Sequence, residues 1–255
     1  MKPCALCLAR KPLRKSHVIP NAIFKRIFKQ SSGKAISIAD DTSTPVSYSQ
    51  DSYWEHLLCA DCEHLLNIQY EGYALDVIRE RRGKAEKHDT ATSLSQIDTT
   101  RLQLFILSVY WRAAVSTHEA FAKVYIPDPW REEIRKAILN KTPTHPQIAS
   151  IKLYRLIDPT ENGGFSDQNL KDVIITPFSR KLDKQFSFHF ILEGFFIEIH
   201  TPGLRYKGRQ ERGVLLKGRK ALLIPHLSIF DIPEVLDAMV SGYGKHLEGN
   251  HRLKE

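Results

Sequence analysis

The four cysteines of this chain form two Cys-x-x-Cys pairs, Cys4 with Cys7 and Cys59 with Cys62. A structural zinc ion takes four thiolate ligands about 2.3 Å away, arranged as a tetrahedron, and two such pairs supply them. A single pair would also suit a thioredoxin-like redox motif. Two disulfides or four unconnected thiols are disfavoured, because the polar start of the chain predicts no secretory signal. The sequence therefore predicts one structural Zn²⁺ held by all four cysteines.

A histidine lies between the two pairs, in the segment Ser16-His17-Val18-Ile19-Pro20. Phosphodiester hydrolysis needs a water deprotonated near neutral pH, and a histidine with an unperturbed pKa of about 6.5 can accept that proton. The reaction also needs a divalent cation on the scissile phosphate. Glu63 and Asn67 are four residues apart, so they lie on one helix face and can share Mg²⁺ or Mn²⁺. The ordinary alternatives are a surface histidine and a glutamate favoured by the helix dipole.

The order of these motifs resembles the HNH endonucleases, in particular bacterial or phage proteins with a Ser-His-hydrophobic-Ile-Pro box. The second half of the resemblance is Cys59-Ala60-Asp61-Cys62-Glu63, followed by Tyr70-Glu71. In that family a ββα-metal unit presents a histidine from its first strand and metal ligands from its helix. The resemblance covers roughly residues 1–75 and implies that the cysteines bind structural zinc and that His17 is the general base. His64 is a weaker ligand candidate than Glu63, and Glu71 continues the same helix face.

Three positions depart from the family pattern. Ser16 stands where the family usually has an Asp or His that ligates the catalytic metal, and no Gly-Gly follows Pro20. Trp54-Glu55-His56 occupies the region just before the second cysteine pair, where the family usually has an Asn. Either Glu55 or His56 takes over a role, or the site is weakened.

Positive charge is concentrated at the start of the chain. The first 39 residues contain nine Lys or Arg and no Asp or Glu, whereas the remainder holds 28 basic and 29 acidic residues. This bias predicts a surface that binds the phosphate backbone of DNA, the alternative being a solvated surface with a chance excess. A second basic cluster from Arg205 to Lys220 suits either another phosphate-contacting loop or an exposed flexible hairpin.

Hydrophobic periodicity predicts the elements that position these residues in the first part of the chain. Residues 21–30 suit a short basic helix with Asn21 as its N-cap, and residues 31–52 suit a loop or weak hairpin. A longer helix is expected from Asp61 to about Arg82. The polar residues 79–96 resemble a linker, so we expect a zinc-bearing ββα-metal unit over residues 1–90.

The rest of the chain, residues 91–255, is predicted to be an α+β domain with a long helix and an antiparallel sheet. The first expected helix is capped by Thr99 or Thr100 and continues to Phe121. Two further helices are expected over residues 130–140 and 233–247. The expected strands are residues 151–156, 173–175 and 221–224, together with a hairpin over residues 186–199 that turns at Glu193-Gly194. Trp111-Arg112 on the long helix is expected to pack in the core, with the arginine extending to the surface.

Three functional hypotheses follow. The first is a metal-dependent HNH-type endonuclease that hydrolyses DNA, with residues 91–255 choosing the substrate or a protein partner, and by analogy a role in bacterial or phage defence. The second is a non-catalytic, zinc-containing nucleic-acid-binding module. The third is a redox or metal sensor, although four thiolates locked on one zinc do not readily react. No apolar stretch approaches the length of a membrane span, so we expect no membrane contact and a cytoplasmic location.

Overall fold

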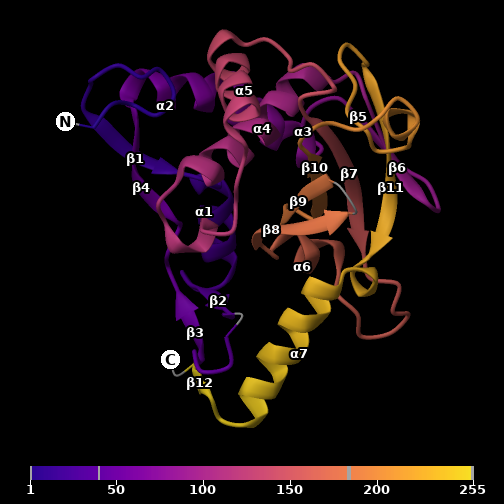
Figure 1. Ribbon diagram of the computed structural model, residues 1–255. Helices are drawn as coiled ribbons and strands as arrows, with labels where there is room; N and C mark the ends of the chain where they lie inside the picture. Colours follow the sequence, from indigo (N-terminus) through magenta and orange to yellow (C-terminus); the bar gives the residue numbers. More distant parts are fainter. Residues whose placement is uncertain (1, 40, 183–184, 254–255) are drawn as a thin grey trace.

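The computed structural model describes residues 2–39, 41–182 and 185–253, and its fold belongs to the α+β class, as the sequence predicts. Two small sheets, β1-β4 and β12-β3-β2, accompany a seven-stranded sheet of order β5-β6-β11-β7-β10-β9-β8. The helices α4 and α5, residues Thr99–Val115 and Asp128–Asn140, lie between the N-terminal elements and the large sheet (Figure 1). No helix of the described part is both long and apolar enough to cross a membrane.

The N-terminal part contains a two-stranded ribbon followed directly by a helix. Strand β1 (Leu13–His17) pairs antiparallel with β4 (Trp54–Cys59), which places His17 opposite Trp54. Helix α1 and a small hairpin stand between the two strands; their bounds are Asn21–Gln30 for α1, Ala35–Ser37 for β2 and Val46–Ser49 for β3. The hairpin confirms one of the two alternatives expected for residues 31–52.

Helix α1 has the expected bounds, and its apolar residues Ile23, Phe24 and Ile27 are buried. Asn21 is not the N-cap but the first helical residue. Pro20 takes the capping position in an extended conformation (φ −52°, ψ 130°), and its carbonyl accepts a hydrogen bond from the Ile23 N–H (2.9 Å). Proline at the cap therefore starts the helix without a side-chain hydrogen bond.

The helix after the second cysteine pair is not uniform. It runs as α2 (Ala60–Leu66), a π-helical turn η1 (Asn67–Glu71) and α3 (Gly72–Ile78), so it ends before the predicted Arg82. Within η1 the Gly72 N–H donates to the Asn67 carbonyl, the i to i+5 pattern of a wider turn. Such turns interrupt α-helices mostly at functional sites, and this one forms part of the wall of the cavity described below.

The expected linker is a hairpin. Strands β5 (Lys84–Lys87) and β6 (Ala91–Ser95) pair antiparallel, and β6 pairs in turn with β11 in the large sheet. One hydrophobic core draws residues from both sides of residue 90, among them Leu58 and Phe105. The division of the chain into two domains at residue 90 stays a prediction, but the segment at that place is ordered sheet.

Helix α4 is capped by Asp98, one residue before the predicted cap, because the Asp98 carboxylate accepts hydrogen bonds from the N–H groups of Thr100 and Arg101. The helix ends at Val115 rather than at Phe121, since Ser116 is extended and only a short 3₁₀ turn, η2 (Glu119–Phe121), follows. Most of its residues are buried, so the helix passes through the core.

The large sheet carries the β9–β10 hairpin at Glu193-Gly194 that the change of parity predicts. Its strands from β7 onward are Ser150–Ile157 (β7), Ile175–Leu182 (β8), Gln185–Leu192 (β9), Phe195–His200 (β10) and Ala221–Ser228 (β11). All pairs are antiparallel except β11 with β7, an exception to the expected pattern. The sequence did not predict the short helix α6 (Asp167–Lys171).

The C-terminal segment returns to the N-terminal part. Helix α7 (Pro233–Leu247) has the predicted bounds and extends away from the large sheet (Figure 1). The short strand β12 (His251–Arg252) then pairs parallel with β3. The small three-stranded sheet therefore joins the C-terminal segment to the hairpin of β2 and β3.

Candidate functional site

The four cysteines converge, as predicted from their spacing. Their Sγ atoms all lie within 4.8 Å of one another, and the Sγ atoms of Cys7 and Cys59 are 3.8 Å apart. A zinc tetrahedron with Zn–S bonds of about 2.3 Å has sulfur–sulfur edges of about 3.8 Å, whereas a disulfide needs about 2.05 Å. All four are free thiols. The donor set and its spacing therefore fit a structural zinc ion.

Local structure holds the four sulfurs in place. Cys59 is the last residue of β4, and Cys62 lies in the first turn of α2. Cys4 lies in a turn closed by the Leu8 N–H to Cys4 carbonyl bond (2.8 Å), and the Cys59 N–H donates to Cys4 Sγ (3.3 Å). Burial and the neighbouring Cys4 raise the pKa of the Cys62 thiol. A cation would offset that penalty and allow four adjacent thiolates.

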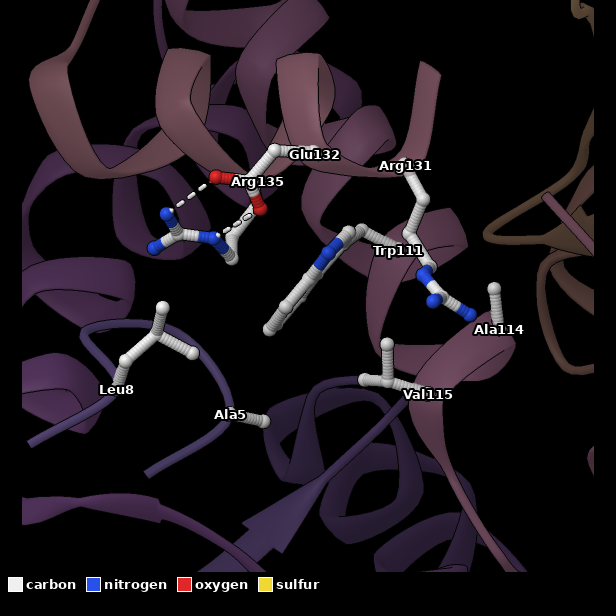
Figure 2. Close-up of a pocket in the computed structure, with 8 residues that line it drawn as sticks. All are labelled: Ala5, Leu8, Trp111, Ala114, Val115, Arg131, Glu132 and Arg135. Carbon is white, nitrogen blue, oxygen red and sulfur yellow. Dashed lines mark hydrogen bonds and ion pairs between the residues drawn. The ribbon is translucent and has the colours of Figure 1, made fainter. Parts of the chain in front are cut away.

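Helices of the second half support this cysteine turn. Arg135 of α5 donates to the Leu6 carbonyl and pairs with Glu132, and the almost fully buried Trp111 of α4 packs beside them. Figure 2 shows the Trp111 indole in a cavity of about 430 Å³ between the cysteine turn and α5. The cavity is lined by Ala5, Leu8, Trp111, Ala114, Val115, Arg131, Glu132 and Arg135. The cysteine turn therefore rests on α4 and α5.

A different cavity, of about 370 Å³, collects the predicted catalytic residues. His17 reaches it from β1, Glu63 from α2 and Asn67 from η1, so all three line the same space. The complete lining is His17, Asn21, Ala22, Lys25, Glu63, His64, Asn67, Glu71 and Arg112. Residues from β1, α1, α2, η1 and α4 meet here, and we refer to this space as the His17 cavity.

His17 is held at both its backbone and its ring. Its carbonyl accepts a hydrogen bond from Arg112 Nη1 (2.7 Å), and its Nε2 lies 3.1 Å from Ser52 Oγ. Burial lowers the pKa of His17, and the positive charge of Arg112 lowers it further. The imidazole is therefore neutral at neutral pH. If Nε2 carries the proton and donates to Ser52, Nδ1 is free to accept another.

Glu63 carries an unsatisfied oxygen. Its Oε1 is buried and has no hydrogen-bond partner within the described residues. Burial raises the pKa of the Glu63 carboxyl, while a hydrogen bond from Ser16 and the charge of Arg112 act in the opposite direction. A buried carboxylate oxygen without a donor is costly. A proton or a cation bound there would remove that cost.

The π-helical turn brings a second carboxylate to the same wall. In an α-helix, residues four apart drift around the axis by about 40°. The wider turn from Asn67 to Glu71 offsets part of that drift, so that Glu71 lines the cavity with Glu63 and Asn67. Glu71 is already paired, because its Oε1 lies 2.8 Å from Arg112 Nη1.

Arg112 is a residue of the cavity wall that the sequence does not place there. It was expected to extend to the surface, but it is 1% exposed. Its guanidinium donates to the Ser108 carbonyl (3.2 Å) as well as to His17, and it pairs with Glu71. An arginine with partners on three elements stays in the interior because its donors are satisfied there. Its one sequence signal is its position in an otherwise apolar helix.

The departures from the HNH pattern have structural explanations. Ser16 is fully buried, and its hydroxyl accepts from the Leu58 N–H (3.0 Å) across the ribbon. Glu55 accepts from Thr117 just after α4, and His56 is exposed against the Trp54 ring. Glu55 and His56 do not line the His17 cavity. The expectation that one of them takes over a missing role therefore finds no support in their positions.

The cysteine cluster and the His17 cavity differ in their ligand sets. Across residues 2–39, 41–182 and 185–253, the cysteines are the one group of three or more His, Cys, Asp or Glu with ligand atoms close enough to hold an ion. In the His17 cavity, Glu63, Glu71, His17 and His64 share the lining with Asn67, but within the described residues their ligand atoms do not form such a group. A cation there would need ligands from outside the protein.

The N-terminal basic residues do not all face outward. Arg26 pairs with Asp172 and with the 1%-exposed carboxylate of Glu193, which also pairs with Arg79. Arg26 therefore joins α1 to the large sheet and is not available to a ligand. Lys25 lines the His17 cavity. The Arg205–Lys220 cluster is mostly exposed and contains a 3₁₀ turn (Gly208–Gln210) rather than a hairpin.

Comparisons with protein-family models, with curated proteins and with solved structures find no match for this chain. Its function therefore has to be inferred from the geometry of the two sites.

Proposed function

We propose that this chain is a metal-dependent HNH-type endonuclease that hydrolyses phosphodiester bonds in DNA. The observation that carries the proposal is the meeting of His17, Glu63 and Asn67 in one cavity, in a chain that also gathers its four cysteines. The histidine and the two possible cation ligands come from separate stretches of the sequence. A base, an unpartnered carboxylate and a nearby arginine in a cavity are the parts expected of a hydrolytic site.

In this proposal His17 removes a proton from the attacking water. Its lowered pKa keeps the ring neutral, and Ser52 holds Nε2 so that Nδ1 takes the proton. Arg112 positions His17 through its carbonyl and orients Glu71. Lys25 in the cavity wall supplies positive charge for the phosphate.

Glu63 and Asn67 would hold a catalytic Mg²⁺ or Mn²⁺. Mg²⁺ in phosphoryl sites commonly takes one or two carboxylates, with substrate phosphate and water completing its shell. The unpartnered Glu63 Oε1 fits that chemistry. The bound cation supplies neutralisation of the charge that develops on the scissile phosphate.

The four-cysteine cluster is assigned to structural Zn²⁺. Free, clustered thiols suit a reducing compartment, so we place the protein in the cytoplasm. A role in bacterial or phage defence, and a substrate- or partner-selecting role for residues 91–255, belong to the same proposal and rest on analogy.

The test is a plasmid-nicking assay with Mg²⁺ and with Mn²⁺. A general base contributes about 10²- to 10⁴-fold, so His17→Ala should lower the rate by that factor. His88→Ala, at an exposed histidine outside the cavity, is the matched control and should cut normally. Unchanged cutting by His17→Ala would contradict the assignment.

A second candidate is a zinc-containing nucleic-acid-binding module without catalysis. The observation in its favour is Ser16, whose hydroxyl is used in the ribbon at the place where the family usually ligates the metal. This candidate is favoured over the endonuclease if the parent protein binds DNA but cuts neither duplex nor single strands with any of several divalent cations.

A further inference from the structure

An exposed tryptophan lies on the strand that pairs with the strand of His17. Trp54 is the Cα partner of His17 in the β1–β4 ribbon and is 40% exposed. The Nζ of Lys15 stands 4.1 Å from the centre of its ring, and the exposed His56 ring meets it edge-on at 5.6 Å. The other tryptophans are more enclosed, Trp111 almost completely and Trp130 partly. A large aromatic side chain is therefore displayed next to the proposed general base.

The same pairing of an exposed aromatic ring with a lysine occurs on β3. Tyr48 is 38% exposed, and the Nζ of Lys34 stands 5.2 Å from its ring centre. Both aromatic residues belong to the elements β1 to β4, which lie on one side of the molecule (Figure 1). Both lysines belong to the first 39 residues, which contain no acidic residue.

Aromatic rings beside cations match the chemistry of an unpaired nucleic-acid strand. A base that is free of its duplex can stack on an indole or phenol ring while the cations neutralise adjacent phosphates. In a duplex the base faces are already covered by neighbouring bases, so these rings would gain no stacking partner. The charge of the N-terminal segment is complementary to such a strand.

We propose that the exposed Lys15–Trp54 pair binds unpaired nucleic acid with one base stacked on Trp54, and that the Lys34–Tyr48 pair is a second contact on the same side of the molecule; together these two pairs are called the stacking surface. Because Trp54 is opposite His17, the stacked nucleotide lies at the edge of the His17 cavity. Its backbone is then next to the proposed base. This inference deepens the proposed function, on which it rests, by naming single-stranded or locally unpaired DNA or RNA as the substrate class.

Binding is measured with the full-length protein carrying His17→Ala and without added divalent cation, so that no cutting intervenes; chelators are omitted because they would remove zinc. The ligands are a 12-nucleotide DNA strand, its duplex, and the RNA strand of the same sequence. Fluorescence anisotropy gives affinity, and tryptophan fluorescence reports stacking. We expect either single strand to bind more tightly than the duplex and to quench the fluorescence. Trp130→Phe should preserve the quenching.

Adding Trp54→Ala should weaken single-strand binding by about 5- to 150-fold and abolish the quenching. Tyr125→Ala, at an exposed tyrosine after η2, is the matched control and should change neither. If Trp54→Ala fails to fold or its zinc content changes, Trp54→Leu is used, which keeps an apolar side chain but no ring and should weaken single-strand binding and abolish the quenching; single-strand binding unchanged in Trp54→Leu would then contradict the inference. Duplex binding as tight as single-strand binding, or single-strand binding insensitive to Trp54→Ala, would overturn the inference.

The stacking surface and the catalytic assignment fail in different ways. Loss of single-strand binding on Trp54→Ala, together with unchanged cutting by His17→Ala, would leave the stacking surface standing and reject the catalytic assignment. Cutting that depends on His17 but acts on duplex DNA without any effect of Trp54→Ala would support the catalytic assignment and reject the stacking surface. Preference for the DNA or the RNA strand identifies which unpaired strand is the ligand.

Discussion

At the scale of single residues, His17 and Arg112 form a coupled pair. Arg112 holds the His17 carbonyl and adds a positive charge that lowers the pKa of the His17 ring. The lowered pKa means that the proposed base stays neutral to lower pH than an exposed histidine would. Activity should therefore rise with pH through a value below about 6.5 and then level off.

Arg112→Gln should move this acidic limb to higher pH. Removing the positive charge raises the pKa of His17, and the unpaired Glu71 carboxylate raises it further, so both effects have the same sign. Arg112→Lys keeps the charge and should leave the limb nearly in place while lowering the rate, because the guanidinium fork is lost. The measurement is kcat/KM against pH for the three proteins. An unshifted limb in Arg112→Gln would contradict the coupling.

Glu63 is the residue at which cation binding should be visible without catalysis. A cation that binds the folded protein stabilises it by an amount that grows with the logarithm of the cation concentration above Kd. We expect Mg²⁺ or Mn²⁺ to raise the Tm of the parent protein and to have little effect on Glu63→Gln, measured by thermal unfolding in the absence of DNA.

Without added Mg²⁺ or Mn²⁺, the Glu63→Gln protein should also be at least as stable as the parent at neutral pH. Burial raises the pKa of the Glu63 carboxyl, so the ionised form costs stability as pH rises above the unfolded-state pKa, and glutamine removes the cost. His64→Gln changes an exposed neighbour in the cavity lining and is the comparison. An equal cation response in the parent and Glu63→Gln would place the cation elsewhere.

At the scale of elements, the cysteine turn, the end of β4 and the start of α2 depend on one another through the four sulfurs. Among the described residues, the segment before β1 has three long-range bonds besides these: from the Ala5 N–H to the Leu57 carbonyl (3.1 Å), from Arg135 to the Leu6 carbonyl, and from Lys11 to Asp61 (2.7 Å). In a loop of this kind the free energy of metal binding becomes folding free energy.

Cys59→Ser should therefore lose zinc and the order of the N-terminal turn together. The matched control is Asp61→Asn, which lies between two of the ligands but makes only an exposed ion pair with Lys11. That variant should retain about one zinc per chain, because an exposed pair of this kind contributes little. Elemental analysis of protein purified without added metal, with hydrogen exchange of residues 2–12, gives the measurement. Full zinc retention by Cys59→Ser would contradict the assignment of the zinc site to the four cysteines.

At the scale of the whole molecule, some basic residues face solvent and others form ion pairs that join parts of the fold. Glu193, at the β9–β10 turn, binds Arg26 of α1 and Arg79 just after α3. These bonds connect the large sheet to α1, which lines the His17 cavity, and to the end of α3. The basic surface open to solvent is accordingly smaller than the count of nine cations in residues 1–39 indicates.

The salt dependence of nucleic-acid binding should follow that division. Replacing Arg14, Lys15 and Lys25 with Gln should lower affinity for unrelated sequences alike and flatten the plot of log affinity against log salt, by up to roughly 0.9 for each duplex phosphate that is no longer neutralised. The same replacement of Arg205, Arg212 and Arg219 should do less, because that region belongs to a charge-balanced part of the chain. Equal or greater weakening from the second set would place the main binding surface on the second half.

By itself, the sequence determined the features that depend on short spacing and local periodicity. The Cys-x-x-Cys pairs predicted the sulfur cluster because each pair presents two ligands from one turn. The parity change at Glu193-Gly194 predicted the β9–β10 hairpin, and the proline at residue 233 marked the start of α7. The i, i+4 spacing put Glu63 and Asn67 on one helix face, and the structure places both at the His17 cavity.

Tertiary structure alone decided which partners the charged and polar residues have. Arg112 lies in the interior because Glu71 and the His17 carbonyl, distant in sequence, satisfy it there. The polar stretch around β5 and β6 pairs into the large sheet, although its composition resembles a linker, because β11 supplies a strand to pair with. The π-helical turn, which carries no local sequence signal here, lets Glu71 reach Arg112. Such choices depend on contacts between residues far apart in the chain, and no local pattern encodes them.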